Sequence, residues 1–114
     1  MFHNENINLS NMKKITTKDA ITSERDKVLR NLREIPGVGK ACSLDFWNIG
    51  LRNITDLKGQ NPKVLYDRLN MITGMTHDIC MLYTFRCAVY FATENDHENE
   101  KLNWWYWKDK EYNE

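Results

Sequence analysis

Hydrophobic residues recur three and four positions apart along most of the chain after residue 22. Such a stripe is typical of helices that bury one face. No segment shows the period of two that a strand requires, so the sequence predicts an all-α fold, a small helical bundle. Ser23 and Asp26 resemble a capping box, which predicts that the first helix begins at Ser23. Its buried stripe is expected to consist of Val28, Leu29, Leu32 and Ile35.

Glycine and proline mark the ends of the next helices. The run Pro36-Gly37-Val38-Gly39 ends the first helix, and a second helix is predicted over residues 40–48, with Gly50 just beyond its end. Thr55 and Asp56 are expected to cap a short turn around Leu57. Between the first and third predicted helices, these glycine, proline and capping residues therefore predict short elements joined by tight turns.

Two longer helices and a terminal segment follow. Asn61 before Pro62 is a strong start signal for a third helix that Gly74 ends. Its stripe is expected to be Val64, Leu65, Leu69 and Ile72. A fourth helix, residues 76–93, is apolar almost all round, which predicts a place in the middle of the bundle. A last helical segment carries Leu102, Trp104, Trp105 and Trp107.

Composition narrows the class of protein. The chain has 114 residues, 41% of them hydrophobic, and its 16 basic residues balance 16 acidic ones. These values suit one small domain with a modest core. Residues 1–22 carry only scattered apolar side chains and are predicted to be a flexible N-terminal arm, which leaves residues 23–114 as the folded domain. The sequence shows no secretory signal or membrane helix, and its three cysteines lack disulfide spacing, so we expect a cytoplasmic protein.

Residues 35–41 carry the clearest motif for binding. Their order, hydrophobic-Pro-Gly-hydrophobic-Gly before a small-residue helix start, resembles the hairpin of helix-hairpin-helix proteins. Glycines permit a tight turn and leave no Cβ in the way of a ligand, while unpaired N–H groups at a helix start attract anions. Val38 is expected to anchor the turn in the core. The predicted phosphate-binding residues are Gly37, Val38, Gly39, Lys40 and Ala41, with Arg33 nearby.

A weaker copy of this hairpin lies 37 residues further on. Placing Gly37 over Gly74 also aligns the apolar stripes of the first and third helices. This agreement indicates tandem helix-hairpin-helix units, of which the second is degenerate. In that second hairpin Thr76 replaces the second glycine and His77 replaces the lysine, so we expect its four residues to be structural: Gly74, Met75, Thr76 and His77.

Several further phrases are more specific than the hairpin. They are Leu65-Tyr66 after Pro62, His77-Asp78-x-Cys80 after Gly74, Phe85-Arg86-x-Ala88-Val89-Tyr90-Phe91-Ala92, and Trp104-Trp105-x-Trp107-Lys108. Together with the hairpin, they resemble the pathogenicity-locus family of helix-hairpin-helix proteins over residues 29–108. The resemblance implies a tandem helix-hairpin-helix fold and supplies no established activity.

No catalytic grouping stands out in the sequence, so we expect a non-catalytic binding protein without a cofactor. Basic residues outnumber acidic ones up to residue 75, and Arg30, Arg33 and Lys40 suit weak, salt-sensitive contact with phosphates. The favoured ligand is nucleic acid, DNA in preference to RNA, bound without sequence specificity. One alternative is a small nucleotide or signalling molecule held between hairpin amides and an aromatic wall, and another is a protein–protein adaptor.

Three other features have competing interpretations. His77, Cys80 and Cys87 are spaced for one helix face but lack the paired cysteines of structural zinc sites, so no metal is expected. Arg86 interrupts the most apolar helix and is expected to pair with Asp45, Asp56 or Asp78, with phosphate binding as the alternative. At least two of the tryptophans in the aromatic run of residues 104–107 are expected to be buried in the core, with base stacking as the alternative role.

Overall fold

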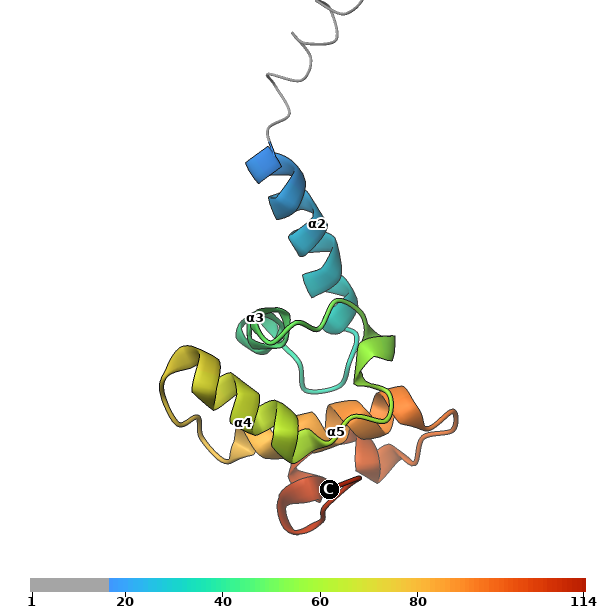
Figure 1. Cartoon of the computed structure of the whole chain (residues 1–114). Coiled ribbons are helices and arrows are strands. Elements are labelled where there is room, and N and C mark those ends of the chain that lie inside the picture. Colours follow the sequence, from blue (N-terminus) through green and yellow to red (C-terminus); the bar gives the residue numbers. More distant parts are fainter. Residues whose placement is uncertain (1–16) are drawn as a thin grey trace, which may run out of the picture.

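The structure, a computed structural model, describes residues 17–114 and the side chains from residue 22 onward (Figure 1). Helices follow one another through this range, and no strand occurs in it, which confirms the all-α prediction. None of the described helices is long and apolar enough to cross a membrane. The elements are α2 (Thr17–Leu32), α3 (Lys40–Asn48), η1 (Ile54–Leu57), α4 (Pro62–Thr73), α5 (Cys80–Thr93), η2 (Asn99–Leu102) and η3 (Trp104–Asp109), the η elements being 3-10 helices.

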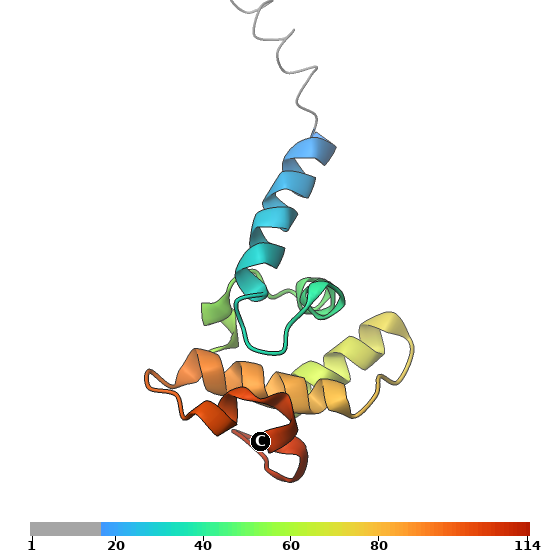
Figure 2. The same cartoon turned by 180° about the vertical axis from the view of Figure 1, so that it is seen from behind.

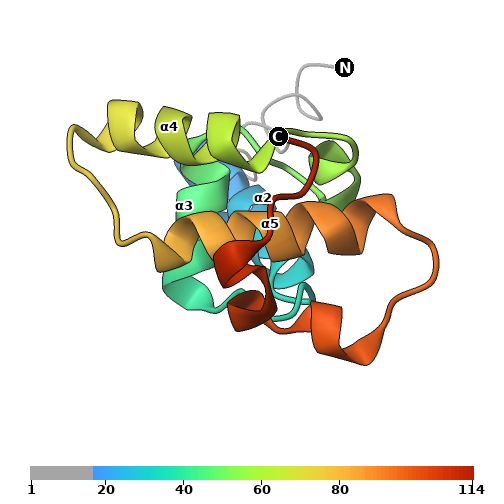
Figure 3. The same ribbon diagram turned by 90° about the horizontal axis from the view of Figure 1, so that it is seen from below.

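Helix α5 lies at the centre of the fold, as its apolar sequence predicts. It packs against α4, η1, η2 and η3, and Figure 3 shows it running across the middle of the molecule. The Phe85 ring stacks on Phe46 of α3 with the two ring centroids 5.0 Å apart, and both side chains are fully buried. The core is therefore built around one helix that is covered on several sides.

Helix α2 enters this core only with its last turns. Val28, Leu29 and Leu32 are buried, while the N-terminal part of the helix extends away from the other elements (Figures 1 and 2). The predicted start at Ser23 is wrong, because Ser23 lies inside α2. Residues 17–22 contain no glycine or proline, so nothing local stops the helix there. Residues 1–16 of the predicted arm lie outside the described residues.

Local turn chemistry explains the ends of α3 and η1. Helix α3 has the predicted bounds and ends in a Schellman motif, in which Gly50, at φ +99°, donates to the Trp47 carbonyl at 3.0 Å. The short turn before Leu57 is present as η1, but its N-cap is Asn53 and not Thr55. The Asn53 side chain accepts from the Asp56 N–H at 3.1 Å, and the Asp56 carboxylate accepts from the Asn53 N–H at 3.3 Å.

Helix α4 begins as predicted but buries fewer residues of its stripe. The Asn61 side chain accepts from the Lys63 N–H at 2.9 Å and from the Val64 N–H at 3.2 Å. Leu65 and Leu69 are fully buried, whereas Val64 is 49% and Ile72 54% exposed. The expected burial of Val64 and Ile72 is wrong, because α4 presents only one narrow face to α5 and its last turn extends beyond the packed region (Figure 3).

The C-terminal segment differs most from the prediction. It forms two 3-10 helices along α5, and of its three tryptophans Trp107 is buried, Trp104 is half-buried and Trp105 is exposed. The expectation of at least two buried tryptophans is therefore wrong. Because the short helix η3 lies on the outside of α5, only one of its sides faces the core. Trp107 lies on that side, whereas the Trp105 ring faces solvent.

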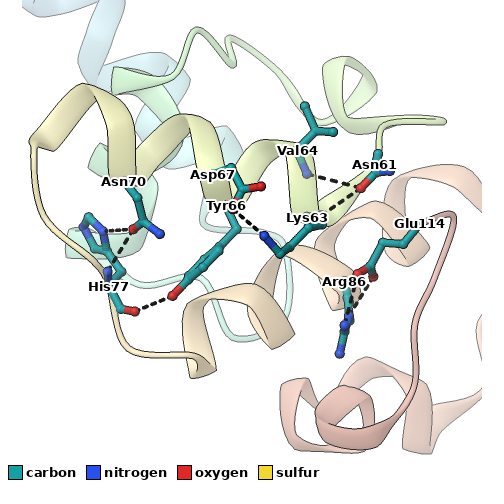
Figure 4. Close-up of polar contacts among 9 residues, drawn as sticks. All are labelled: Asn61, Lys63, Val64, Tyr66, Asp67, Asn70, His77, Arg86 and Glu114. Atoms are coloured by element: carbon teal, nitrogen blue, oxygen red, sulfur yellow. Dashed lines mark hydrogen bonds and ion pairs between the residues drawn. The ribbon is translucent and has the colours of Figure 1, made fainter.

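Arg86 forms the expected buried ion pair, but with a different partner. Its guanidinium donates two hydrogen bonds to the Glu114 carboxylate, at 2.7 and 3.0 Å, and a third to the Trp107 carbonyl at 2.9 Å (Figure 4). The three aspartates considered from the sequence are not its partners. The ion pair joins the central helix to the last residues described and so holds the C-terminal segment against the core.

Candidate functional site

The first hairpin is a tight turn anchored in the core. The Val38 N–H donates to the Ile35 carbonyl at 3.1 Å, with Pro36 second and Gly37 third in the turn. Gly37 has φ +84°, which together with the proline gives the pattern of a type II turn. Val38 is buried, as predicted, so the turn holds the following residues in a defined position at the start of α3.

The N-terminus of α3 has open hydrogen-bond donors. Its N-cap is Gly39, no side chain caps it, and its first turn contains no acidic residue. The helical ladder starts with the Ser43 N–H, which donates to the Gly39 carbonyl at 2.9 Å. Among the described residues, nothing accepts from the backbone N–H groups of Gly39, Lys40 and Ala41, all three of which are exposed. Donors of this kind, at the positive end of a helix dipole, favour an anion.

The two glycines of this hairpin differ in what the fold requires of them. Gly37 needs its positive φ, whereas Gly39 has φ −98° and ψ −164°, an extended conformation open to other residues. A Cβ added at Gly39 would meet no atom within 4 Å. The fold therefore gives no steric reason for a glycine at this position, while a ligand that approaches the backbone closely would need one.

Two cationic residues accompany these donors. Lys40 is the first residue of α3 and is exposed, and Arg33 is half-buried just after the end of α2. Neither side chain forms an ion pair within the part of the chain that the structure describes. Glu34, which directly follows Arg33, accepts a hydrogen bond from the Asn31 side chain at 3.1 Å. The charge needed to balance a phosphate is thus present beside the open amides.

The second hairpin is built differently. Gly74 directly follows α4 with φ +70°. Helix α5 begins at Cys80, so the start at Thr76 that the sequence predicts is wrong. His77 does not start this helix because its N–H donates to the Asn70 side chain at 2.8 Å, and its carbonyl accepts from the Tyr66 hydroxyl (Figure 4). These contacts hold the loop in an extended path toward α5.

An acidic side chain occupies the start of α5. The Asp78 carboxylate accepts from the Cys80 N–H at 2.8 Å, and this hydrogen bond lowers the pKa of Asp78. Met75 and Thr76, which belong to the candidate second site, are exposed in the loop before it. A carboxylate at this position repels a phosphate, so the two hairpins offer anions opposite electrostatic environments.

The spacing of His77, Cys80 and Cys87 does not produce a common helix face. His77 lies before α5, Cys80 is exposed at its first turn, and Cys87 is fully buried. Burial raises the pKa of the Cys87 thiol to about 11. In residues 17–114 there is no group of three histidine, cysteine or acidic residues placed to hold a metal ion.

The hairpin has an aromatic neighbour that sequence reasoning did not place there. The Trp104 Cδ1 atom lies 3.4 Å from the position that a Cβ on Gly37 would take. Trp104 in turn packs edge-to-face with Trp105, with the ring centroids 5.6 Å apart. The aromatic run was noticeable in the sequence, but no spacing rule connects it to a turn so far away along the chain.

Comparison with known proteins gives one finding. A family model described as Pathogenicity locus matches residues 25–113. This range begins in α2 and includes both hairpins and the tryptophan-containing segment. Neither curated proteins nor solved structures include a match to the chain.

Proposed function

The chain belongs to the Pathogenicity locus family, and from this premise we propose that it is a non-catalytic protein that binds nucleic-acid phosphates at its first hairpin. In this proposal α2, the turn at residues 36–39 and α3 form a helix-hairpin-helix unit, and α4 with α5 forms a degenerate second unit. DNA is the proposed ligand. Because backbone amides contact phosphates and not bases, the binding has no sequence specificity.

The observation that carries the proposal is the open start of α3. Uncapped amides at Gly39, Lys40 and Ala41 lie in exposed residues after a tight turn, whereas asparagine side chains cap η1 and α4 and the Asp78 carboxylate accepts from the first N–H of α5. Gly39 adds to it, because a Cβ at this position would meet no atom of the fold and glycine leaves that space open to a ligand. Both features are expected of a helix start that receives an anion.

Affinity is expected to be low and sensitive to salt. The chain has no net charge and the site offers Lys40, with Arg33 nearby, as its cations, so few counterions are released on binding. Non-specific contacts of this kind have dissociation constants of about 1–100 µM at physiological salt, and we expect the weak end of that range. Binding should therefore be measured first at low salt and then followed as salt increases.

Charge reversal at the hairpin provides the direct test. We expect Lys40→Glu to weaken binding of a short labelled DNA about tenfold or more at low salt, because it places a carboxylate beside the amides. Lys58→Glu is the matched control, since it makes the same charge change at an exposed lysine outside the hairpin. Fluorescence anisotropy across a salt series measures the DNA affinity of both variants. Equal binding by the wild type and the two variants would refute the proposal.

Gly39→Asp separates binding from folding in the same titration. An aspartate at the N-cap accepts from the open amides of α3, so it should stabilise the protein by about 0.3–1 kcal/mol. The same carboxylate occupies the anion position and should abolish DNA binding. A variant that unfolds at higher urea concentration and no longer binds cannot have lost binding through misfolding.

A second candidate ligand is a small nucleotide, and the contact between Trp104 and Gly37 favours it because it places an aromatic ring against the turn that precedes the open amides. Mononucleotides added to the DNA titration distinguish the two ligands. A mononucleotide that displaces DNA at matched phosphate concentration, and raises the melting temperature, favours the small ligand. Displacement only by longer strands favours nucleic acid.

A further inference from the structure

Only one of the four tryptophans offers a free and exposed ring. Trp105 is 59% exposed, whereas Trp107 is buried beneath Tyr90 and Tyr112. The Trp47 ring is covered by the Arg52 guanidinium, whose central carbon lies 3.5 Å from the ring centroid. Trp104 is half-buried and contacts the first hairpin. The indole of Trp105 is therefore available for contact with a ligand.

The place of Trp105 connects it to the first hairpin. Its ring packs edge-to-face on Trp104, and Trp104 packs on Gly37, two residues before the first open amide of α3. Figures 2 and 3 show η3 next to the turn that leads into α3. The Trp105 ring is therefore connected, through Trp104, to the same turn that positions the amides.

We propose that Trp105 is a base-stacking residue and that the ligand of the first hairpin is single-stranded nucleic acid; this inference rests on the proposed function. A phosphate on the amides of α3 and a base of a neighbouring nucleotide on Trp105 would use two adjacent surfaces of one site. In a duplex the bases are stacked on each other and their faces are covered, whereas a single strand exposes them. The ring thus supplies a preference for single strands that amides and a lysine alone do not supply.

Stacking also suits the absence of net charge. Proteins that bind single strands without sequence preference combine phosphate contacts with aromatic platforms, and the platform contributes binding that salt weakens little. With Lys40 and Arg33 as the cations near the site, Trp105 is the side chain next to the hairpin that can add such a contribution. We therefore expect single-strand binding to fall less steeply with salt than duplex binding.

The test compares Trp105→Ala with Trp105→Phe in the full chain. Oligothymidine and a hairpin duplex of equal phosphate count are titrated at low salt. Trp105→Ala should weaken oligothymidine binding about tenfold and leave duplex binding unchanged, while Trp105→Phe keeps a ring and should retain most of the affinity. Met71→Ala, which removes another exposed apolar side chain, is the control and should change neither. Circular dichroism checks that each variant is folded.

Tryptophan fluorescence supplies an independent readout. Stacking should quench the Trp105 emission, so oligothymidine should quench the wild type and not Trp105→Phe. If Trp105→Ala leaves the ratio of single-strand to duplex affinity unchanged while Lys40→Glu still weakens binding about tenfold or more, the stacking inference is wrong and the proposed function stands. If no nucleic acid binds the wild type at low salt, both are wrong.

Discussion

At the scale of single residues, two glycines of one turn have different physical roles. Gly37 adopts φ +84°, so any other residue would be strained there, although a Cβ would meet the Trp104 side chain only at ordinary contact distance. Gly39 is extended and faces open space. The same residue type therefore serves the fold at one position and leaves room for a ligand at the other.

This difference predicts unequal costs for the same substitution. Gly37→Ala should lower the free energy of unfolding by about 1–2 kcal/mol, because alanine is disfavoured at positive φ. Gly39→Ala should lower it by about 0.5 kcal/mol, the difference between glycine and alanine as an N-cap. Urea denaturation of the two variants measures both values. Equal losses would contradict the role assigned to Gly37.

At the scale of elements, the helices differ in how their first N–H groups are satisfied. Asn61 caps α4 and Asn53 caps η1, while Asp78 accepts from the first N–H of α5. Helix α3 has no such side chain, and neither do the two short 3-10 helices η2 and η3. Because capping stabilises a helix by roughly 1 kcal/mol, an uncapped start is a local loss of stability. This loss occurs at the element where the binding site is proposed.

The cap of α4 can be tested by itself. Asn61→Ala should lower the free energy of unfolding by about 1 kcal/mol, because the N–H groups of Lys63 and Val64 lose their acceptor. Asn61→Asp keeps an acceptor beside the positive end of the helix dipole and should be close to the wild type. Urea denaturation distinguishes them, and a neutral Asn61→Ala would mean that these two hydrogen bonds contribute nothing.

At the scale of the whole molecule, one buried ion pair closes the structure. The side chains of Arg86 and Glu114 are each 9% exposed, and their hydrogen bonds raise the pKa of the Arg86 guanidinium. The pair holds the C-terminal residues on α5, and the same segment carries the tryptophans that contact the first hairpin. The ion pair and the candidate site are thus connected through η3.

Removing the carboxylate should destabilise the protein strongly. Glu114→Ala leaves the Arg86 guanidinium buried without its charge partner, which we expect to cost about 3 kcal/mol of unfolding free energy. Glu114→Gln keeps one acceptor oxygen and should cost less. Chemical denaturation followed by tryptophan fluorescence measures the effect, because Trp107 lies against the pair. A loss below about 0.5 kcal/mol would show that the C-terminal segment is held by its aromatic packing alone.

Local chemistry made much of the fold predictable. The all-α class, the bounds of α3, the start of α4 and the buried face of α2 all follow from residues within one or two turns of each other. Caps, prolines and glycines act over that range, so the sequence alone specifies them. The residues of the first hairpin were found in the same way, because the turn and the helix start are contiguous.

Tertiary structure alone decided the partner of Arg86, the exposure of Ile72 and Trp105, the late start of α5 and the contact between Trp104 and Gly37. Each of these depends on which side chains from distant parts of the chain meet, and helical periodicity says only that a face is apolar. The sequence by itself determined that the described chain is helical, where α3 begins and ends, and that a glycine-containing turn precedes α3. Packing around α5 determined which aromatic ring lies beside that position, because burial is a property of the assembled elements.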